Sequence, residues 1–238
     1  MSQTKSAASD VLLQDWRKVA PFIDHSLLRP ESTREQVVRL CQEAVHYGFP
    51  AVFAHPSYVA IAASVLRGTS VKPGTTVGFS MGSTLTTVKR FEALEVLRLG
   101  AGELDMVMNV GALKSGAHQL VENDIRSIVE IAHDAGAILK VILETSLLTR
   151  EEKVTACELS VAARADFVKT STGLLGGATV EDVVLMRSVV GNRAKVKASG
   201  GVRTLAQLAA MVTAGAERIG TSSGVAMVQE AGASDLPI

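Results

Sequence analysis

LKVIL (139–143), FVKTSTG (167–173) and VKASGG (196–201) are three short apolar runs, and each of them carries one lysine. The segments between them, 150–163 and 180–189, have apolar residues at helical spacing. Short β-rich runs that alternate with helical segments are typical of a parallel sheet whose strands are connected by helices. This stretch therefore predicts an α/β fold with one lysine on each of three successive strands.

The same alternation extends over the whole chain. The predicted strands are 22–24, 51–54, 76–79, 103–107, 139–143, 167–169, 195–198 and 218–220. The predicted helices include 34–47, 87–99, 120–135, 150–163, 180–189 and 205–214. Several of these helices end on a glycine that suits a left-handed cap: Gly48, Gly100, Gly136 and Gly215.

Eight parallel strands is the number that closes a (β/α)₈ TIM barrel. A doubly wound open sheet is the alternative, but the glycine fingerprint G-x-G-x-x-G is missing after the first strand. No linker or change in composition divides the chain. We therefore expect one barrel domain over 1–238, with a short N-terminal helix at about 1–20 beneath the barrel and a C-terminal tail at about 226–238.

Composition limits the classes of partner. Of the 238 residues, 47% are apolar and 20% are charged, and 24 basic side chains balance 24 acidic ones. No basic run is present, so a nucleic acid is not an expected partner. No apolar run is long enough to span a bilayer, and a signal-peptide core is missing. Cys41 and Cys157 fall in predicted helices without metal-like or redox spacing. We expect a cytoplasmic protein with no membrane association and reduced cysteines.

In a barrel of this type the active site lies at the carboxyl ends of the strands. The polar residues expected there are Asp24, Asp105, Asn109, Lys140, Glu144, Lys169, Lys197 and Ser199. These residues could be structural ion pairs that hold the barrel closed. Buried charges are costly unless function retains them, so the whole set favours a catalytic site.

The lysines indicate the type of reaction. Lys169 and Lys197 lie on neighbouring strands about 4.8 Å apart, so their amines are expected to be within reach of each other. Burial and a second ammonium both lower a lysine pKa, which makes the amine a nucleophile for Schiff-base formation with a carbonyl. Asp105 and Lys140 could form a pair that holds a water and moves protons, and Asp24 could complete this polar cluster.

Three glycine-rich loops predict an anion site. SGGVRT (199–204) follows the seventh strand, GTSSG (220–224) follows the eighth, and STGLLGG (171–177) follows the sixth. Loops seven and eight form the common phosphate site of these barrels, where backbone N–H groups point at the anion. Ordinary tight turns are the alternative, but the loops together favour phosphate binding.

Six motifs together resemble deoxyribose-phosphate aldolase, a family of class I aldolases: IDHSLLRP, ELDMVMNVGALK, LKVILETSLLT, DFVKTSTG, VKASGGVRT and RIGTSSG. The resemblance implies cofactor-free, reversible cleavage of 2-deoxy-D-ribose 5-phosphate to acetaldehyde and D-glyceraldehyde 3-phosphate. It makes Lys169 the Schiff-base residue and gives Lys197 the role of lowering the pKa of Lys169. Asp105 would transfer protons with Lys140, and Asp24 would support them. The implied phosphate contacts are Gly173, Ser199, Gly200, Gly201, Arg203, Gly220, Ser222 and Ser223.

The chain departs from the family pattern in several places. Ser26 and Arg29 replace the usual threonine and lysine, Ser146 stands in a motif that commonly has cysteine, and the tail has no tyrosine for proton transfer. The spacing of the histidines does not fit a metal site, so we expect no metal. Two alternatives stay open: a Schiff-base aldolase with another phosphorylated substrate, and a catalytically silent phosphosugar-binding barrel. The expected partners are a phosphorylated sugar and small aldehydes, and the family suggests a homodimer.

Overall fold

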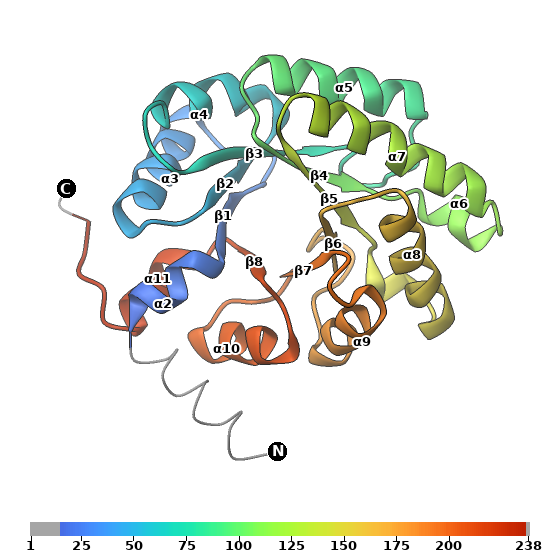
Figure 1. Cartoon of the computed structure of the whole chain (residues 1–238). Helices are drawn as coiled ribbons and strands as arrows, with labels where there is room; N and C mark the ends of the chain where they lie inside the picture. The colour runs from blue at the N-terminus through green and yellow to red at the C-terminus, as the bar shows by residue number, and fades with distance from the viewer. Residues whose placement is uncertain (1–14, 237–238) are drawn as a thin grey trace.

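The computed structural model describes residues 15–236, and eight strands in this range form one closed barrel (Figure 1). The strands are β1 Ile23–Leu27, β2 Ala51–Ala54, β3 Lys72–Val77, β4 Glu103–Val107, β5 Ile138–Ile142, β6 Phe167–Lys169, β7 Lys195–Ser199 and β8 Arg218–Thr221. Each strand pairs in parallel with the next one, and β8 pairs in parallel with β1. The predicted (β/α)₈ barrel is confirmed, and the open doubly wound sheet is excluded.

Helices surround the barrel (Figure 1). They are α2 Trp16–Val19, α3 Arg34–Tyr47, α4 Val59–Val65, α5 Thr86–Arg98, α6 Val110–Lys114, α7 His118–Asp134, α8 Arg150–Ala162, α9 Val180–Val190, α10 Leu205–Ala214 and α11 Gly224–Glu230. The four glycines expected to end helices all have positive φ: Gly48, Gly100, Gly136 and Gly215. Within residues 15–236, every helix is too short or too polar to cross a bilayer.

Strand β3 differs most from its predicted bounds, because it begins at Lys72 and not at residue 76. The sequence KPGTTV suggests a turn at Pro73 and Gly74, yet both residues pair with β2. A Cβ at Gly74 would lie 2.6 Å from the ring of Phe53, so this glycine makes room for an aromatic side chain. Short helices α4 and α6 were also not predicted, because five to seven residues carry too little periodicity.

The first and last described helices, α2 and α11, pack against each other. The predicted N-terminal helix falls partly on residues 1–14, which are outside the described range. Its described part, α2, packs against α11, where the Trp16 N–H donates to the Ala231 carbonyl at 3.1 Å (Figure 1). Helix α11 continues to Glu230, so the C-terminal stretch from residue 226 begins as a helix.

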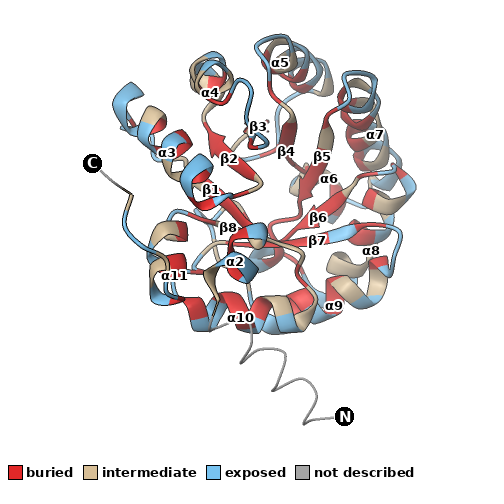
Figure 2. Ribbon diagram, turned by 60° about the vertical axis from the view of Figure 1, so that its left-hand side comes forward, coloured by how far each residue is buried: buried red, intermediate tan, exposed pale blue. Residues whose placement is uncertain are grey.

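Buried residues concentrate on the strands and on the inward faces of the helices (Figure 2). Strand register decides what fills the barrel, because side chains alternate between its inside and outside. Asp105 is paired with Lys140 across β4 and β5, and Lys169 with Lys197 across β6 and β7. These charged residues replace the branched apolar side chains that usually fill such a barrel.

Candidate active site

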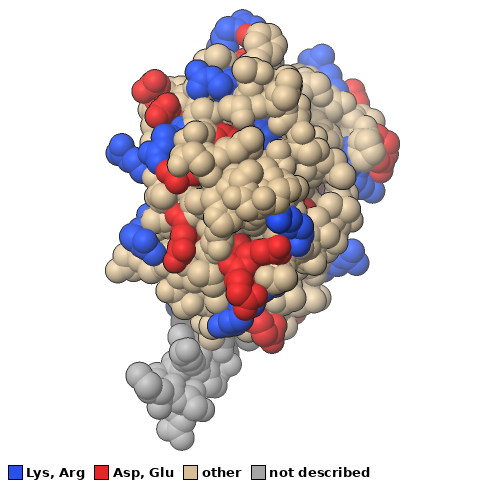
Figure 3. All heavy atoms as spheres, turned by 90° about the vertical axis from the view of Figure 1, so that its right-hand side faces the viewer, with Lys and Arg blue, Asp and Glu red and all other residues tan. Residues whose placement is uncertain are grey.

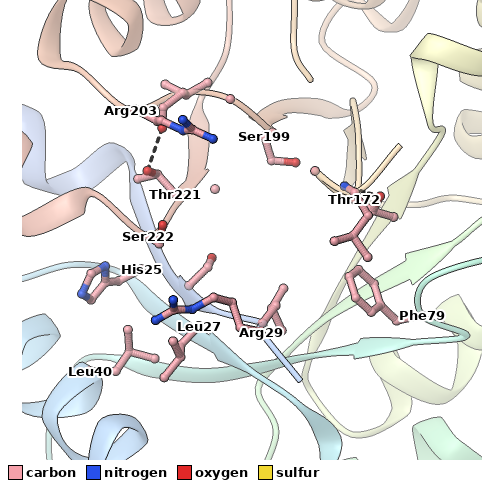
Figure 4. Close-up of a pocket in the computed structure, with 18 of the residues that line it drawn as sticks. His25, Leu27, Arg29, Leu40, Phe79, Thr172, Ser199, Arg203, Thr221 and Ser222 are labelled. Carbon is pink, nitrogen blue, oxygen red and sulfur yellow. Dashed lines mark hydrogen bonds between the residues drawn. The ribbon is translucent and has the colours of Figure 1, made fainter. Parts of the chain in front are cut away.

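A cavity of about 640 Å³ opens at the carboxyl ends of the strands. Its lining comes mainly from β1 with its loop, helix α3, and the loops that follow β6, β7 and β8. Figure 4 shows Arg203, Thr221 and Ser222 on one side and Thr172 and Phe79 on the other. Lys169 belongs to the lining. The other predicted catalytic residues, Lys197, Asp105, Lys140 and Asp24, are all fully buried deeper in the barrel.

Lys169 is the lysine that reaches the cavity. It is only 3% exposed, and its Nζ donates to Asp105 Oδ2 at 2.7 Å. Burial lowers the pKa of Lys169 to about 8; Asp105 opposes this shift, whereas Lys197 and then Lys140 add to it. Desolvation is thus the main cause, and the second ammonium expected from the sequence contributes less. At pH 7 roughly a tenth of such amines would be neutral.

Asp105 holds two lysines with one oxygen. Its Oδ2 accepts hydrogen bonds from Lys169 Nζ and Lys197 Nζ, both at 2.7 Å, and its Oδ1 lies 3.5 Å from Lys140 Nζ. Burial alone would raise the pKa of Asp105, but the three ammonium groups outweigh burial and lower it. Asp105 is therefore an anion at neutral pH and links the three lysines electrostatically.

Lys197 lies between two carboxylates. Its Nζ is 2.6 Å from Asp24 Oδ2 and 2.7 Å from Asp105 Oδ2. The Lys197 Nζ also lies 3.8 Å from the centroid of the Phe53 ring, a cation–π distance. This environment keeps Lys197 beneath the cavity. Asp24 reaches it from β1 and Asp105 from β4.

Lys140 lies deeper in the barrel and has a carboxylate partner that the sequence argument missed. Its Nζ contacts Glu103 and lies 3.7 Å from Asp24 Oδ2. Burial lowers the pKa of Lys140, but Asp24, Asp105 and Glu103 outweigh burial and raise it. Arg218 contacts Asp24 and Glu103 and completes the network. Glu103 and Arg218 were missed because they lie toward the amino ends of β4 and β8.

Neither member of the predicted Asp105–Lys140 pair gives up its charge readily. The pKa of Asp105 is lowered and that of Lys140 is raised, so both are charged at neutral pH. A direct proton exchange between the two is therefore unfavourable. The pair can still orient a water molecule, which is the role expected from the sequence.

Seven of the eight predicted phosphate residues line the cavity: Gly173, Ser199, Gly200, Gly201, Arg203, Gly220 and Ser222. Ser223 is the exception, because its N–H donates to Thr221 Oγ1 at 2.9 Å and it lies outside the lining. Thr221 in turn donates to the Val202 carbonyl at 2.8 Å, drawn as a dashed line in Figure 4. This bond joins the loops after β7 and β8.

The glycines in these loops permit close backbone contact. Gly200 and Gly201 both have positive φ, and a Cβ at Gly200 would lie 2.8 Å from the Gly176 carbonyl oxygen. A Cβ at Gly177 would lie 2.7 Å from the Gly200 carbonyl oxygen. Gly176 and Gly177 therefore bring the loop after β6 against the loop after β7.

Gly220 and Ser199 support the lysines as well as line the cavity. A Cβ at Gly220 would lie 2.9 Å from Ser199 Cβ and 3.1 Å from Lys197 Cε. The Ser199 hydroxyl donates to the Ser171 carbonyl at 2.5 Å. Its oxygen is therefore partly engaged within the protein. Gly220 leaves the space through which the Lys197 side chain passes.

Three arginines line the cavity: Arg29, Arg203 and Arg39, and Arg39 is paired with Glu43 at 2.9 Å. Figure 4 shows Arg203 on one side of Ser222 and Arg29 on the other. The Arg203 N–H donates to Gln207 Oε1 at 2.8 Å, which fixes the backbone of this loop at the start of α10. Arg29 pairs loosely with Glu31 at 3.6 Å. Arg29 stands where the family commonly has lysine, and its cationic head was not assigned a role from the sequence.

The remaining polar candidates serve the scaffold around the site. Asn109 Oδ1 accepts from the Ala112 N–H at 3.0 Å and caps α6. His25 lines the cavity, and its Nε2 lies 2.8 Å from Glu43 Oε2. Among residues 15–236, no group of three or more His, Cys, Asp or Glu side chains is arranged to hold a metal ion.

A closed (β/α)₈ barrel with a buried, pKa-lowered lysine on a cavity wall defines a protein equipped for Schiff-base chemistry on a carbonyl compound. A family model described as DeoC/LacD family aldolase matches residues 18–230. The chain belongs to this aldolase family.

Named relatives agree with the family. The deoxyribose-phosphate aldolase of Thermococcus gammatolerans is 54% identical over 216 residues, which cover 90% of this chain and 96% of the relative. That of Geobacillus sp. is 54% identical over 212 residues, 89% of this chain and 95% of the relative. The structure of the Aeropyrum pernix deoxyribose phosphate aldolase, described as a unique tetramer, has a TM-score of 0.88 at 34% identity and covers 96% of this chain and 97% of that one.

Proposed function

We propose that this chain is a deoxyribose-phosphate aldolase, which reversibly cleaves 2-deoxy-D-ribose 5-phosphate to acetaldehyde and D-glyceraldehyde 3-phosphate. The observation that carries the proposal is Lys169, a buried lysine of pKa about 8 in the wall of a cavity that glycine-rich loops also line. Relatives at 54% identity with this name support the choice of substrate.

Lys169 is the nucleophile. Its neutral Nζ attacks the aldehyde carbon C1 of the open-chain sugar, and loss of water leaves a protonated imine. Removal of the C3 hydroxyl proton lets the C2–C3 bond break, and its electron pair moves into the imine. Glyceraldehyde 3-phosphate leaves, the enamine takes a proton at C2, and water releases acetaldehyde. The imine serves as the electron sink, so no cofactor enters these steps.

The charged network beneath Lys169 supports proton movement. Asp105 is held as an anion by three lysines, so it orients Lys169 and Lys197 and does not carry the proton itself. Asp105 and Lys140 would orient a water that exchanges protons with the substrate, and Asp24 would fix Lys197 from the other side.

The phosphate would lie at the loops after β7 and β8. Backbone N–H groups of Gly200, Gly201 and Ser222 and the Arg203 guanidinium are suited to a dianion there. Gly173 and Ser199 complete this side of the cavity, and Gly220 keeps Lys197 in place. Ser223 would act indirectly, through its hydrogen bond to Thr221.

The test is a cleavage assay with purified full-length protein. We expect 2-deoxyribose 5-phosphate to yield acetaldehyde and glyceraldehyde 3-phosphate, and Lys169→Met to abolish turnover. Lys195→Met is the matched control, because Lys195 is 60% exposed on the next strand. Turnover of another phosphorylated sugar in place of deoxyribose 5-phosphate would favour a Schiff-base aldolase with a different substrate. No turnover of any phosphorylated sugar by a folded protein that still binds one would favour the silent barrel.

We also propose that the protein forms a homodimer in the cytoplasm. Helix α5 and the residue before it expose an apolar stripe: Leu85 at 71%, Val88 at 49%, Phe91 at 67% and Leu94 at 52%. A second copy of the chain is the expected occupant, as the tetrameric Aeropyrum relative supports self-association. The two cysteines are free and buried, and burial raises the pKa of both Cys41 and Cys157 to about 12, so neither thiol is a ready nucleophile.

A further inference from the structure

Glu144 is a buried carboxyl group that the proposed mechanism does not use. It follows β5, is 1% exposed and has a φ of 57°, a left-handed backbone that few residues other than glycine adopt. The amides on either side of it continue the pairing with β6: the Leu143 N–H donates to the Lys169 carbonyl at 2.9 Å, and the Thr145 N–H donates to the Thr170 carbonyl at 3.0 Å. The strained turn thus holds Glu144 against the end of β6.

The Glu144 side chain is dedicated to Thr172. Its Oε2 accepts the Thr172 hydroxyl at 2.5 Å and the Thr172 N–H at 3.1 Å. Within residues 15–236, the Glu144 carboxyl has no hydrogen-bond partner other than Thr172. The hydroxyl and the N–H of Thr172 therefore both donate to the same buried oxygen, Glu144 Oε2.

These bonds determine whether the Thr172 hydroxyl can donate or accept a further hydrogen bond. A hydroxyl has one hydrogen and two lone pairs. The hydrogen is given to Glu144, and one lone pair accepts the Leu174 N–H at 3.2 Å. One lone pair remains on a residue that lines the cavity (Figure 4). Thr172 can therefore accept a hydrogen bond from a ligand, but it cannot donate one.

We infer that Glu144 is a positioning residue that makes Thr172 a hydrogen-bond acceptor and so selects substrates with a hydroxyl at this point. The inference rests on the proposed function. Thr172 lies in the chain between Lys169, which takes the carbonyl end, and Gly173 at the phosphate side. The substrate group that faces Thr172 is then the C4 hydroxyl of the sugar, next to the phosphate-bearing carbon. After cleavage this group is the C2 hydroxyl of glyceraldehyde 3-phosphate. A hydroxyl donates to Thr172, whereas a hydrogen atom at the same carbon cannot.

The test compares two acceptor aldehydes in the synthetic direction with acetaldehyde: D-glyceraldehyde 3-phosphate and 3-phosphooxypropanal, which lacks the C2 hydroxyl. The readout is the ratio of their kcat/KM values. Glu144→Asp keeps the carboxyl and suits the left-handed backbone, but it is too short to reach Thr172. Glu144→Gln has the same length and keeps an accepting oxygen.

We expect Glu144→Asp to lower kcat/KM for the hydroxylated aldehyde by about 5- to 10-fold, the usual effect of losing a neutral hydrogen bond, here the one from the ligand hydroxyl to Thr172. The value for 3-phosphooxypropanal should change little, so the ratio falls. Glu144→Gln should keep the ratio within about threefold of wild type. Thr172→Val should lower the ratio of the two kcat/KM values as Glu144→Asp does, and Thr172→Ser should keep the ratio. In the double variant, Glu144→Asp should lower the ratio little beyond the effect of Thr172→Val alone.

An equal loss for both aldehydes in Glu144→Asp would overturn the inference, because a purely structural role affects both alike. An unchanged ratio in Thr172→Val, or a fall of the ratio in Glu144→Gln equal to that in Glu144→Asp, would also overturn it. Borohydride trapping on wild type separates this test from the proposed function. Absence of a Lys169 adduct in wild type counts against the aldolase, whereas a normal adduct with an unchanged ratio counts against Glu144 alone.

Discussion

One aspartate oxygen, Asp105 Oδ2, holds Lys169 and Lys197 at the same distance of 2.7 Å. The two lysines differ in what surrounds them. Lys169 touches the cavity, whereas Lys197 is enclosed by Asp24, Asp105 and the Phe53 ring. The difference assigns the nucleophile to Lys169 and leaves Lys197 as its buried neighbour.

Replacement of Lys197 should change the pH dependence of catalysis. The Lys197 ammonium lowers the pKa of Lys169, so Lys197→Met should raise that pKa. At a given pH fewer Lys169 amines are then neutral, and the acidic limb of the kcat/KM profile should move about one unit to higher pH. The profile should be measured beside that of Lys195→Met, which lies on the same strand. If the acidic limb of the Lys197→Met profile stays in place or moves to lower pH, Lys197 does not lower the pKa of Lys169.

Among individual residues, the sequence predicted the part of the charged network nearest the cavity and missed the part at the amino ends of the strands, Glu103 and Arg218. Lys169, Lys197 and Asp105 were predictable because active sites of such barrels lie at the carboxyl ends of the strands. Glu103 precedes Asp105 by two positions on β4, so side-chain alternation puts both inside the barrel. Applying that alternation to the amino ends would have found Glu103 and Arg218.

The loops after β6, β7 and β8 act as one unit at the scale of elements. Gly177 and Gly200 contact each other across two loops, and Thr221 joins the third loop through the Val202 carbonyl. Gln207 of α10 holds the Arg203 backbone. Hydrogen bonds between loops therefore fix the surface on which we propose that the phosphate binds.

Arg203→Ala should mainly weaken phosphate binding. We expect the KM for 2-deoxyribose 5-phosphate to rise by about 10- to 100-fold, with a smaller change in kcat, because a bond between charged groups is lost. Cleavage of unphosphorylated 2-deoxyribose under the same conditions is the control and should be nearly unaffected. Equal losses for both sugars would show that Arg203 supports the loop and does not contact phosphate.

Element boundaries were predictable where periodicity was long and failed where it was short. Helix α3 begins and ends at the predicted residues, with a capping box at Thr33 and Gly48 at its end. The strand predicted at 76–79 is Lys72–Val77 in the structure, and Pro73 and Gly74 are residues that are uncommon inside strands. Only the packing of the Phe53 ring against Gly74 explains a glycine inside this strand, and that contact lies outside local sequence.

Barrel closure is the feature of the whole molecule that assembles the site. Asp24 on β1 and Lys197 on β7 are distant in sequence and meet because β8 pairs with both neighbouring strands.

The surface over α6 to α8 has acidic and basic side chains interspersed around an uncharged centre (Figure 3). The exposed apolar stripe of α5 is the candidate interface on this molecule.

Phe91→Glu tests that stripe. Phe91 is 67% exposed, so the substitution should leave the fold intact while placing a charge in an apolar contact. Light scattering after size exclusion should show a dimer for wild type and a monomer for the variant. Leu120→Glu is a matched control, because Leu120 is 50% exposed on α7. A dimer that persists in Phe91→Glu would contradict the assignment of the interface to α5.

The most direct test of the account is borohydride reduction of the protein with 2-deoxyribose 5-phosphate, followed by peptide mapping of the adduct. Lys169 is the lysine that combines contact with the cavity and a lowered pKa. We predict one adduct per chain, on the peptide that contains Lys169 and absent from Lys169→Met. An adduct on Lys197 would reverse the two roles, and the absence of any adduct on a folded, active enzyme would contradict the Schiff-base mechanism itself.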